Sequence, residues 1–425
     1  MTTPPDAVYA KVRRRILPLL TLCYFVAFID RVNVGFAALS MNAEFGFSPV
    51  VYSAGAGIFF IGYFVFEVPS NLILERVGAR LWIARIMITW GIVSMAMAMV
   101  RGPISFFALR FLLGVAEAGF FPGILLYLTY WFPAPERARV TALFFVANPI
   151  GSAVGGAISG ALLGLHFAGL SSWQWLFILE GGPAVVLGVI VWAVLHDGPD
   201  DAPWLTAAER AALATTLAAD RQSRANPKHL TLLQGLREPR ILLLSGVYFG
   251  CVAGNYGLAF WLPQILKEFG LTNIQTGLLN ALPFAIGAGV MMLWSAHSDR
   301  TGERIFHVAI PLALVTAALV ASSQLASPVA MMAVLCVAGI GIFANTPPFW
   351  TLPTSVTVGT AAAGGIALVN SIGNLSGFLA PYLIGVIKDS TGSFRIALGT
   401  LAILPLAGMI LTLRLRRLSP APAGR

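Results

Sequence analysis

The sequence predicts an all-α integral membrane protein whose twelve transmembrane helices form two six-helix, pseudo-symmetric bundles. Three observations lead to this fold class: the composition, the number of long apolar segments and an internal repeat. Of the 425 residues, 57% are hydrophobic and only 11% are charged, and the mean hydropathy is +0.81. A soluble domain carries about 25% charged residues. The composition therefore excludes a soluble globular protein and a disordered chain.

Twelve apolar segments are long enough to cross a bilayer, which takes about 20 helical residues. The first follows a basic run that resembles a signal peptide, but no small-residue cleavage site follows it, and we interpret it as an uncleaved helix. The alternation that is typical of barrel strands is absent from the sequence. The segments are expected near residues 16–40, 52–73, 81–100, 104–131, 139–165, 173–195, 240–265, 275–296, 307–325, 328–350, 360–386 and 395–415.

The basic residues predict the orientation of these helices. Loops on the opposite side from the termini hold only Arg101, Lys267, Lys388 and Arg395, and most other Lys and Arg residues lie on the side of the termini. Cytoplasmic loops carry an excess of Lys and Arg. We therefore expect a multi-pass protein of the inner (plasma) membrane, with the lipid bilayer as a partner and both termini in the cytoplasm.

One long connection divides the chain into three predicted parts. Residues 1–196 form an N-terminal six-helix bundle, residues 197–239 a cytoplasmic linker, and residues 240–425 a C-terminal six-helix bundle. Within the linker, Thr206-Ala-Ala-Glu209 has the spacing of a capping box before an Ala- and Leu-rich stretch. This spacing predicts an amphipathic helix that lies along the membrane surface.

The two predicted bundles are related in sequence. One constant shift aligns Tyr24 with Tyr248, and a shift two residues shorter aligns Asn148 with Asn370. Two parallel six-helix repeats that enclose a site near the bilayer midplane are typical of transporters.

The same repeat duplicates a charged loop. The acid-Arg-x-Gly-x-Arg pattern occurs once between helices 2 and 3 and again between helices 8 and 9. Such loops are also explained by the positive-inside rule alone, but their duplication at matching points favours a conformational latch. The predicted gating residues are Glu75, Arg76, Arg80, Asp299, Arg300 and Arg304.

Several sequence runs resemble the major facilitator superfamily, and within it the anion:cation symporter family. The resemblance extends along nearly the whole chain and is carried by residues 30–40, 62–71, 109–122, 131–139 and 175–181. It implies the major facilitator fold and a permease for tartrate, phthalate, hydroxyphenylacetate, sugar acids or similar carboxylates.

Charged residues inside the predicted spans are the strongest pointers to a site, because each costs about 2.5–3.5 kcal/mol to insert and so pairs or lines a cavity. Asp30 and Arg31 lie about halfway along helix 1, and Arg110 lies at nearly the same depth in helix 4. A guanidinium binds a carboxylate through two hydrogen bonds. We therefore predict that Arg31 and Arg110 bind substrate; the alternative is a structural ion pair with a carboxylate.

The acids in the spans receive different interpretations. Adjacent helical residues point about 100° apart, so Asp30 cannot neutralise Arg31 locally. We predict that Asp30 and Glu117 carry protons, with a static partner role as the alternative, and the family resemblance implies the same assignments for these acids and the two arginines. Glu67 is expected to belong to the latch, and Glu180 to a structural pair.

The second half has no charge inside its predicted spans and offers neutral polar groups instead. Tyr248, Asn255, Asn370 and Asn374 are the predicted substrate-binding residues there. Asn370 and Asn374 lie on one helix face beside glycines, a pattern that hydrogen bonding between helices also explains.

Together these features predict a proton-coupled symporter that imports a small organic carboxylate by alternating access. The carboxylate is a tartrate-like hydroxy acid, a sugar acid or an aromatic acid. The alternatives are an organic-anion exchanger or facilitator, which needs no protonatable acid, and a transporter-like membrane sensor. No nucleophile, metal or cofactor motif appears in the sequence, so we expect a protein that is not an enzyme and has no metal and no cofactor, with protons as the coupling ion. We also expect it to bind no nucleic acid and to function as a monomer.

Overall fold

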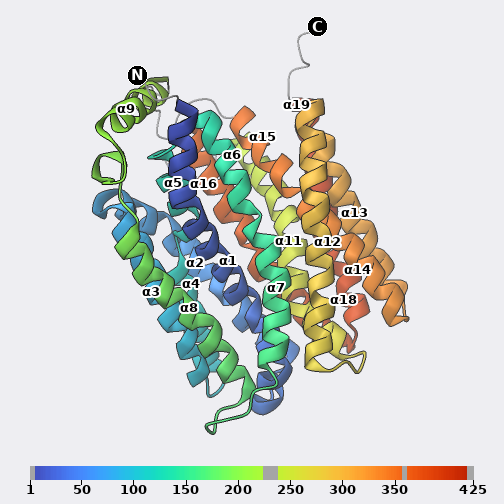
Figure 1. The fold of residues 1–425 in the computed structure, drawn as a ribbon. Helices are drawn as coiled ribbons and strands as arrows, with labels where there is room; N and C mark the ends of the chain where they lie inside the picture. The colour runs from blue at the N-terminus through green and yellow to red at the C-terminus, as the bar shows by residue number, and fades with distance from the viewer. Residues whose placement is uncertain (1–4, 224–237, 357–360, 419–425) are drawn as a thin grey trace.

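The computed structural model describes residues 5–223, 238–356 and 361–418, and these residues are almost entirely helical. Helix α1 begins and α19 ends at the same end of the molecule (Figure 1), which we call the terminal end; the other is the opposite end. The blue-to-green helices lie beside the yellow-to-red helices, so the described helices form two groups.

The first group contains the helices up to residue 194. Its elements are α1 (Pro5–Phe45), α2 (Pro49–Val77), α3 (Ala79–Ala96), the 3-10 turn η1 (Met97–Met99), α4 (Pro103–Glu117), α5 (Phe120–Thr129), α6 (Ala134–Phe145), α7 (Ala147–Leu162) and α8 (Ser172–Val194).

The 3-10 turn η2 (Pro199–Asp201) and helix α9 (Ala207–Ser223) follow this group. The second group consists of α11 (Pro239–Lys267), α12 (Asn273–Thr301), α13 (Ile305–Gln324), α14 (Pro328–Ala344), α15 (Thr346–Val356), α16 (Ala361–Asn374), α17 (Ser376–Thr391), α18 (Phe394–Leu401) and α19 (Ile403–Leu418).

These helices confirm the predicted fold class. Within the described residues, 11 helical stretches are long and apolar enough to cross a membrane, and they coincide with 11 of the predicted segments. The remaining segment, near 360–386, falls on α16 and α17, which are separated at Leu375.

Several spans consist of two helices in sequence, and the break between α4 and α5 has a local cause. Gly119 adopts a φ of +85°, which favours glycine. A Cβ atom at this position would also lie 2.3 Å from the hydroxyl oxygen of Ser70. The break is therefore built around a residue that has no side chain.

The predicted capping box is present at the start of α9. The Glu209 amide donates to the Thr206 hydroxyl at 3.2 Å, and Oε2 of Glu209 accepts from the Thr206 amide at 2.8 Å. Glu209 also forms an ion pair with Nζ of Lys11 at 2.8 Å. The Lys11 ammonium thereby holds the pKa of Glu209 below its usual range. This pair links α9 to α1. The predicted limits of the two bundles and the linker stay a prediction.

The two groups touch at α7 and α12, where small residues let the helices come together. A Cβ atom on Gly160 of α7 would lie 2.7 Å from the Asn273 carbonyl oxygen and 2.8 Å from Cα of Gly277 on α12. Nearby, the Tyr52 hydroxyl donates to the Phe260 carbonyl at 2.9 Å. Glycine allows this backbone contact between membrane helices, and larger side chains do not.

We expect Gly160→Leu to separate α7 from α12, because the side chain would meet backbone atoms, and overpacking of this kind costs about 1–3 kcal/mol. Spin labels at Phe167 and Ile274, which are both exposed near this contact, should move further apart. Gly289→Ala is the matched control, since a Cβ on Gly289 meets no atom within 4 Å. An unchanged label distance in Gly160→Leu would contradict the proposed packing constraint.

Candidate substrate-binding site

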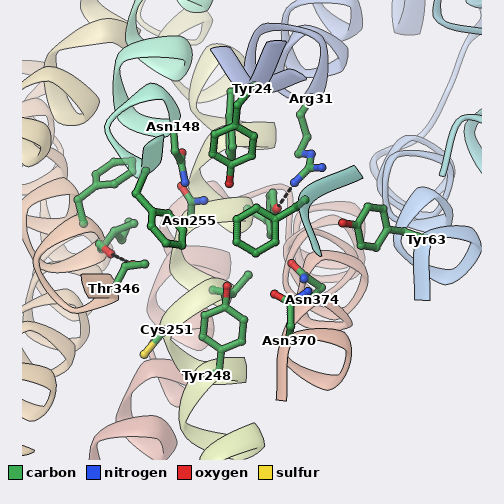
Figure 2. A pocket seen from close by; sticks show the side chains of 17 residues that line it. Tyr24, Arg31, Tyr63, Asn148, Tyr248, Cys251, Asn255, Thr346, Asn370 and Asn374 are labelled. Carbon is green, nitrogen blue, oxygen red and sulfur yellow. Dashed lines mark hydrogen bonds between the residues drawn. The ribbon is translucent and has the colours of Figure 1, made fainter. Parts of the chain in front are cut away.

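A pocket lies between the two groups of helices, and Figure 2 shows its lining side chains. The lining is mainly aromatic and polar, and Arg31 is the one charged side chain among the described residues that form it. The polar side chains are Tyr24, Arg31, Tyr63 and Asn148 from the first group and Tyr248, Asn255, Tyr256, Thr346, Asn370 and Asn374 from the second.

Arg31 connects the two groups across this pocket. Its Nη2 forms an ion pair with Oε1 of Glu117, on α4 of its own group. Its Nη1 donates to the Tyr256 hydroxyl, on α11 of the other group, at 3.0 Å. Nε has no hydrogen-bond partner among the described residues. The Arg31 side chain is 9% exposed, and its guanidinium has one charged partner, one neutral partner and an Nε–H that no described residue accepts.

Asp30 points away from the pocket. Its carboxylate accepts hydrogen bonds from Trp90 Nε1 at 2.7 Å, from Asn33 Nδ2 at 3.1 Å and from the Ser94 hydroxyl. Trp90 and Ser94 lie on α3, so Asp30 binds an adjacent helix while Arg31 faces the pocket. The two neighbours diverge as the geometry of one helix requires.

The structure places Arg110 outside the pocket lining. It is 1% exposed, its Nη2 donates to the Ala56 carbonyl at 2.8 Å, and its guanidinium lies 5.0 Å from the centre of the Phe59 ring. Its Nε has no partner among the described residues. Arg110 therefore lies within the packing of α2 against α4, and its role in substrate binding stays a prediction.

The second group supplies the neutral polar wall that the sequence predicts. Tyr248, Asn255, Asn370 and Asn374 all line the pocket. Oδ1 of Asn255 is buried without a hydrogen-bond partner among the described residues. A buried polar atom left unpaired costs about 1–3 kcal/mol, so this oxygen is available to a hydrogen-bond donor that enters the pocket.

Sequence reasoning missed Tyr24, Tyr63, Asn148 and Thr346 as pocket residues. The internal repeat contained the signal for two of them, because Tyr24 aligns with Tyr248 and Asn148 aligns with Asn370. Matching positions of the two halves thus face the same pocket from both sides. Tyr63 and Thr346 had no comparable signal.

Glu67 does not lie where the sequence suggested. It was expected in the latch, yet its carboxylate is buried against α16 of the other group. Asn370 Nδ2 donates to it at 2.7 Å and the Ser371 hydroxyl at 2.5 Å. The reason is that Glu67 lies one helical turn beyond the pocket residue Tyr63 and so faces the second group.

Of the two repeated loops, the second contains an ion pair of its own. Arg304 Nη1 lies 2.7 Å from Oδ1 of Asp299 and also donates to the Ser298 hydroxyl at 2.9 Å. Arg300 is exposed. Asp299 is 68% exposed, and pairs of this kind stabilise a fold by about 1 kcal/mol or less.

The first loop is held by an acid from outside the motif. Glu75 and Arg76 are exposed, whereas Oδ1 of Asp197 accepts from the Arg80 amide at 2.8 Å. Gly78 has a φ of +93°, and a Cβ there would lie 2.8 Å from the same oxygen. The loop is therefore closed against the segment that follows α8. A gating role for either loop stays a prediction.

Two groups of helices that are long and apolar enough to cross a membrane, with a polar pocket between them, are typical of membrane transporters, and the family of this chain is one of transporters and not of enzymes. The chain matches the Major Facilitator Superfamily over residues 20–381 and belongs to it. It is 52% identical to a protein of Agrobacterium vitis named "Putative tartrate transporter", across 98% of this chain and 96% of that protein.

Two further similarities are to a transporter with a different name and to a solved structure. A "Quinolone resistance transporter" of Acinetobacter baumannii is 43% identical over 94% of this chain and 92% of its own length. The crystal structure of a bacterial homolog of the human lysosomal transporter Spinster superposes with a TM-score of 0.78 at 17% identity, covering 97% of this chain and 99% of that one. The last similarity shows the fold alone.

Exchanging each arginine for lysine should separate their roles. Arg31→Lys loses the fork that contacts Glu117 and Tyr256, so we expect substrate affinity to fall about tenfold or more, with normal folding. Arg110→Lys, outside the pocket lining, should reduce affinity less. Calorimetric titration of the purified variants measures both effects. A larger loss in Arg110→Lys would place substrate at α4 instead.

For the loops, we expect Asp197→Ala to shift the balance between conformations, because the first loop loses its acceptor. Glu75→Gln is the matched control, since Glu75 is exposed. The native Cys251 lines the pocket and can report accessibility to thiol reagents from each side, once Cys23 and Cys336 are replaced. Equal labelling of Cys251 in both variants would show that the loop does not control the conformation.

Proposed function

We propose that this transporter is a proton-coupled symporter that imports a small organic carboxylate by alternating access across the inner membrane. The observation that supports this proposal is the ion pair between Arg31, which lines the pocket, and Glu117, which is buried beside it and does not line the pocket. It places the cation that suits a carboxylate substrate in contact with an acid that can take up a proton.

The coupling follows from competition for one guanidinium. While Glu117 is ionised it occupies Nη2 of Arg31, and an arriving anion meets a site whose charge is already neutralised. Protonation of Glu117 removes this competitor and leaves a net positive group. A substrate carboxylate then binds the guanidinium through two hydrogen bonds. Proton and anion binding therefore favour each other, and this coupling is reciprocal.

Release uses the same competition in reverse. When Glu117 loses its proton on the inner side, its carboxylate returns to Arg31 and displaces the substrate. Tyr256 extends the effect to the second group of helices, since its hydroxyl accepts from the same guanidinium. Asp30, bound to Trp90 and Ser94, is the second candidate for the proton carrier.

The neutral lining bears on the substrate class. A carboxylate on Arg31 would lie among amide and hydroxyl groups, including those of Tyr24, Asn148, Tyr248 and Asn255. Such groups suit an acid that carries hydroxyl or carbonyl groups of its own. The name of the Agrobacterium vitis relative supports a tartrate-like acid. We further propose that the monomer is the functional unit and that the terminal end faces the cytoplasm.

The decisive experiment compares two modes of transport in proteoliposomes. Glu117→Gln cannot exchange a proton, so it should lose accumulation of labelled carboxylate driven by a pH gradient. It should still exchange internal for external substrate, because exchange never requires the empty, deprotonated carrier to reorient.

The remaining outcomes of this experiment assign the mechanism. Loss of uphill uptake in Asp30→Asn but not in Glu117→Gln would identify Asp30 as the carrier. Uphill uptake that persists in both variants would rule out this mechanism. A wild-type protein that exchanges anions but never concentrates them under a pH gradient is an exchanger.

A further inference from the structure

Glu67 is a buried acid that the coupling mechanism does not use. It is 1% exposed, and each of its carboxylate oxygens accepts one hydrogen bond from α16: Oε1 from Asn370 Nδ2 at 2.7 Å and Oε2 from the Ser371 hydroxyl at 2.5 Å. No lysine or arginine forms an ion pair with it among the described residues. Both donors are neutral and belong to the other group of helices.

Of these donors, Asn370 also lines the substrate pocket, whereas Ser371 does not. Figure 2 shows Asn370 beside Asn374 in the pocket wall. Tyr63, one turn before Glu67 on α2, is a pocket residue as well. Glu67 therefore lies directly behind the wall, in contact with a side chain that substrate can reach.

The chemistry of the contact fixes the orientation of the Asn370 amide. In the structure the Asn370 amide turns its NH₂ toward Glu67, and a carboxylate oxygen that accepts this hydrogen bond holds the amide in that orientation. Because the oxygen and nitrogen of an amide lie on opposite sides of its carbon, Oδ1 is then the atom left for the pocket. Asn148 and Asn255 have no such partner: the Oδ1 atoms of both are buried without a hydrogen bond among the described residues. Those two amides can rotate to offer a donor or an acceptor.

We infer that Glu67 is a positioning residue for substrate recognition: it holds the Asn370 amide so that the pocket presents an oxygen acceptor, which selects a carboxylate bearing a hydroxyl group. This inference rests on the proposed function and narrows its substrate class. Arg31 binds the carboxylate, and Asn370 accepts the hydroxyl hydrogen. An acid of the same length without hydroxyl groups leaves the Asn370 oxygen unpaired. A site that hydrogen-bonds a substrate hydroxyl binds the analogue without it more weakly for this reason.

The test compares tartrate with succinate, which share two carboxylates and a four-carbon chain but differ in the hydroxyl groups. We expect purified wild-type protein to bind tartrate about tenfold more tightly than succinate. This difference in binding free energy corresponds to about one hydrogen bond. Glu67→Gln should reduce this ratio to about threefold or less, because a glutamine amide accepts either orientation of Asn370. Its succinate affinity should remain unchanged.

Two further variants make the test independent of Glu67 itself. Asn370→Leu removes the acceptor and should lose the tartrate preference while Glu67 stays in place. Ser371→Ala is the matched control: it removes the other donor to Glu67 but leaves Asn370 held, so it should keep the preference. If Glu67→Gln does not fold, as judged by size-exclusion chromatography, Glu67→Asp takes its place: it keeps the charge but draws the carboxylate away from the Asn370 amide, so the tartrate preference should fall in the same way, and an unchanged ratio would overturn the positioning role.

The outcomes separate this inference from the proposed function. A folded Glu67→Gln that keeps the wild-type ratio, or that weakens both acids equally, overturns the positioning role. Equal binding of both acids by the wild type overturns the inference but leaves carboxylate transport intact. Binding of neither acid by the wild type overturns the carboxylate assignment and the inference with it.

Discussion

The structure depends on how one guanidinium is paired in a medium that does not solvate it. Arg31 lies in a pocket wall between two groups of helices, where an unpaired charge costs several kcal/mol. Glu117 neutralises it from its own group and Tyr256 hydrogen-bonds to it from the other. Any change in either partner, by protonation or by an arriving anion, alters both the charge of the pocket and a contact between the halves. In the proposed mechanism, substrate binding and the relative position of the halves are therefore linked through one side chain.

Much of this architecture could be predicted from sequence because it follows from length and periodicity. The spans are set by the thickness of the bilayer, and the start of α9 by the spacing of Thr206 and Glu209. The divergence of Asp30 and Arg31 follows from helix geometry alone. The repeat could also have identified Tyr24 as a pocket residue, because Tyr24 aligns with Tyr248 and both line the pocket.

What could not be predicted depends on contacts between helices. Depth along a helix placed Arg110 at the level of Arg31, but depth does not define which way a side chain points. Arg110 reaches the Ala56 carbonyl of α2 instead of the pocket. Likewise, the position of Glu67 near a loop motif suggested a latch, whereas its direction is set by the packing of α2 against α16. The direction of a side chain and the packing of helices are tertiary properties, and length and periodicity in one sequence do not predict them.

The distribution of charge also fits the proposed alternating access, in which contacts between the halves break. Among the described residues of the spans, the ion pair of Arg31 with Glu117 lies within the first group. Across the interface, each charged group meets neutral partners: Arg31 meets Tyr256, and Glu67 meets Asn370 and Ser371. Breaking a buried ion pair costs about 3–5 kcal/mol, whereas a hydrogen bond to a charged group is worth about 1.5–3 kcal/mol. In the proposed cycle, the contacts that break between the halves are therefore of the weaker kind, and the ion pair inside the first half opens only when Glu117 takes up a proton.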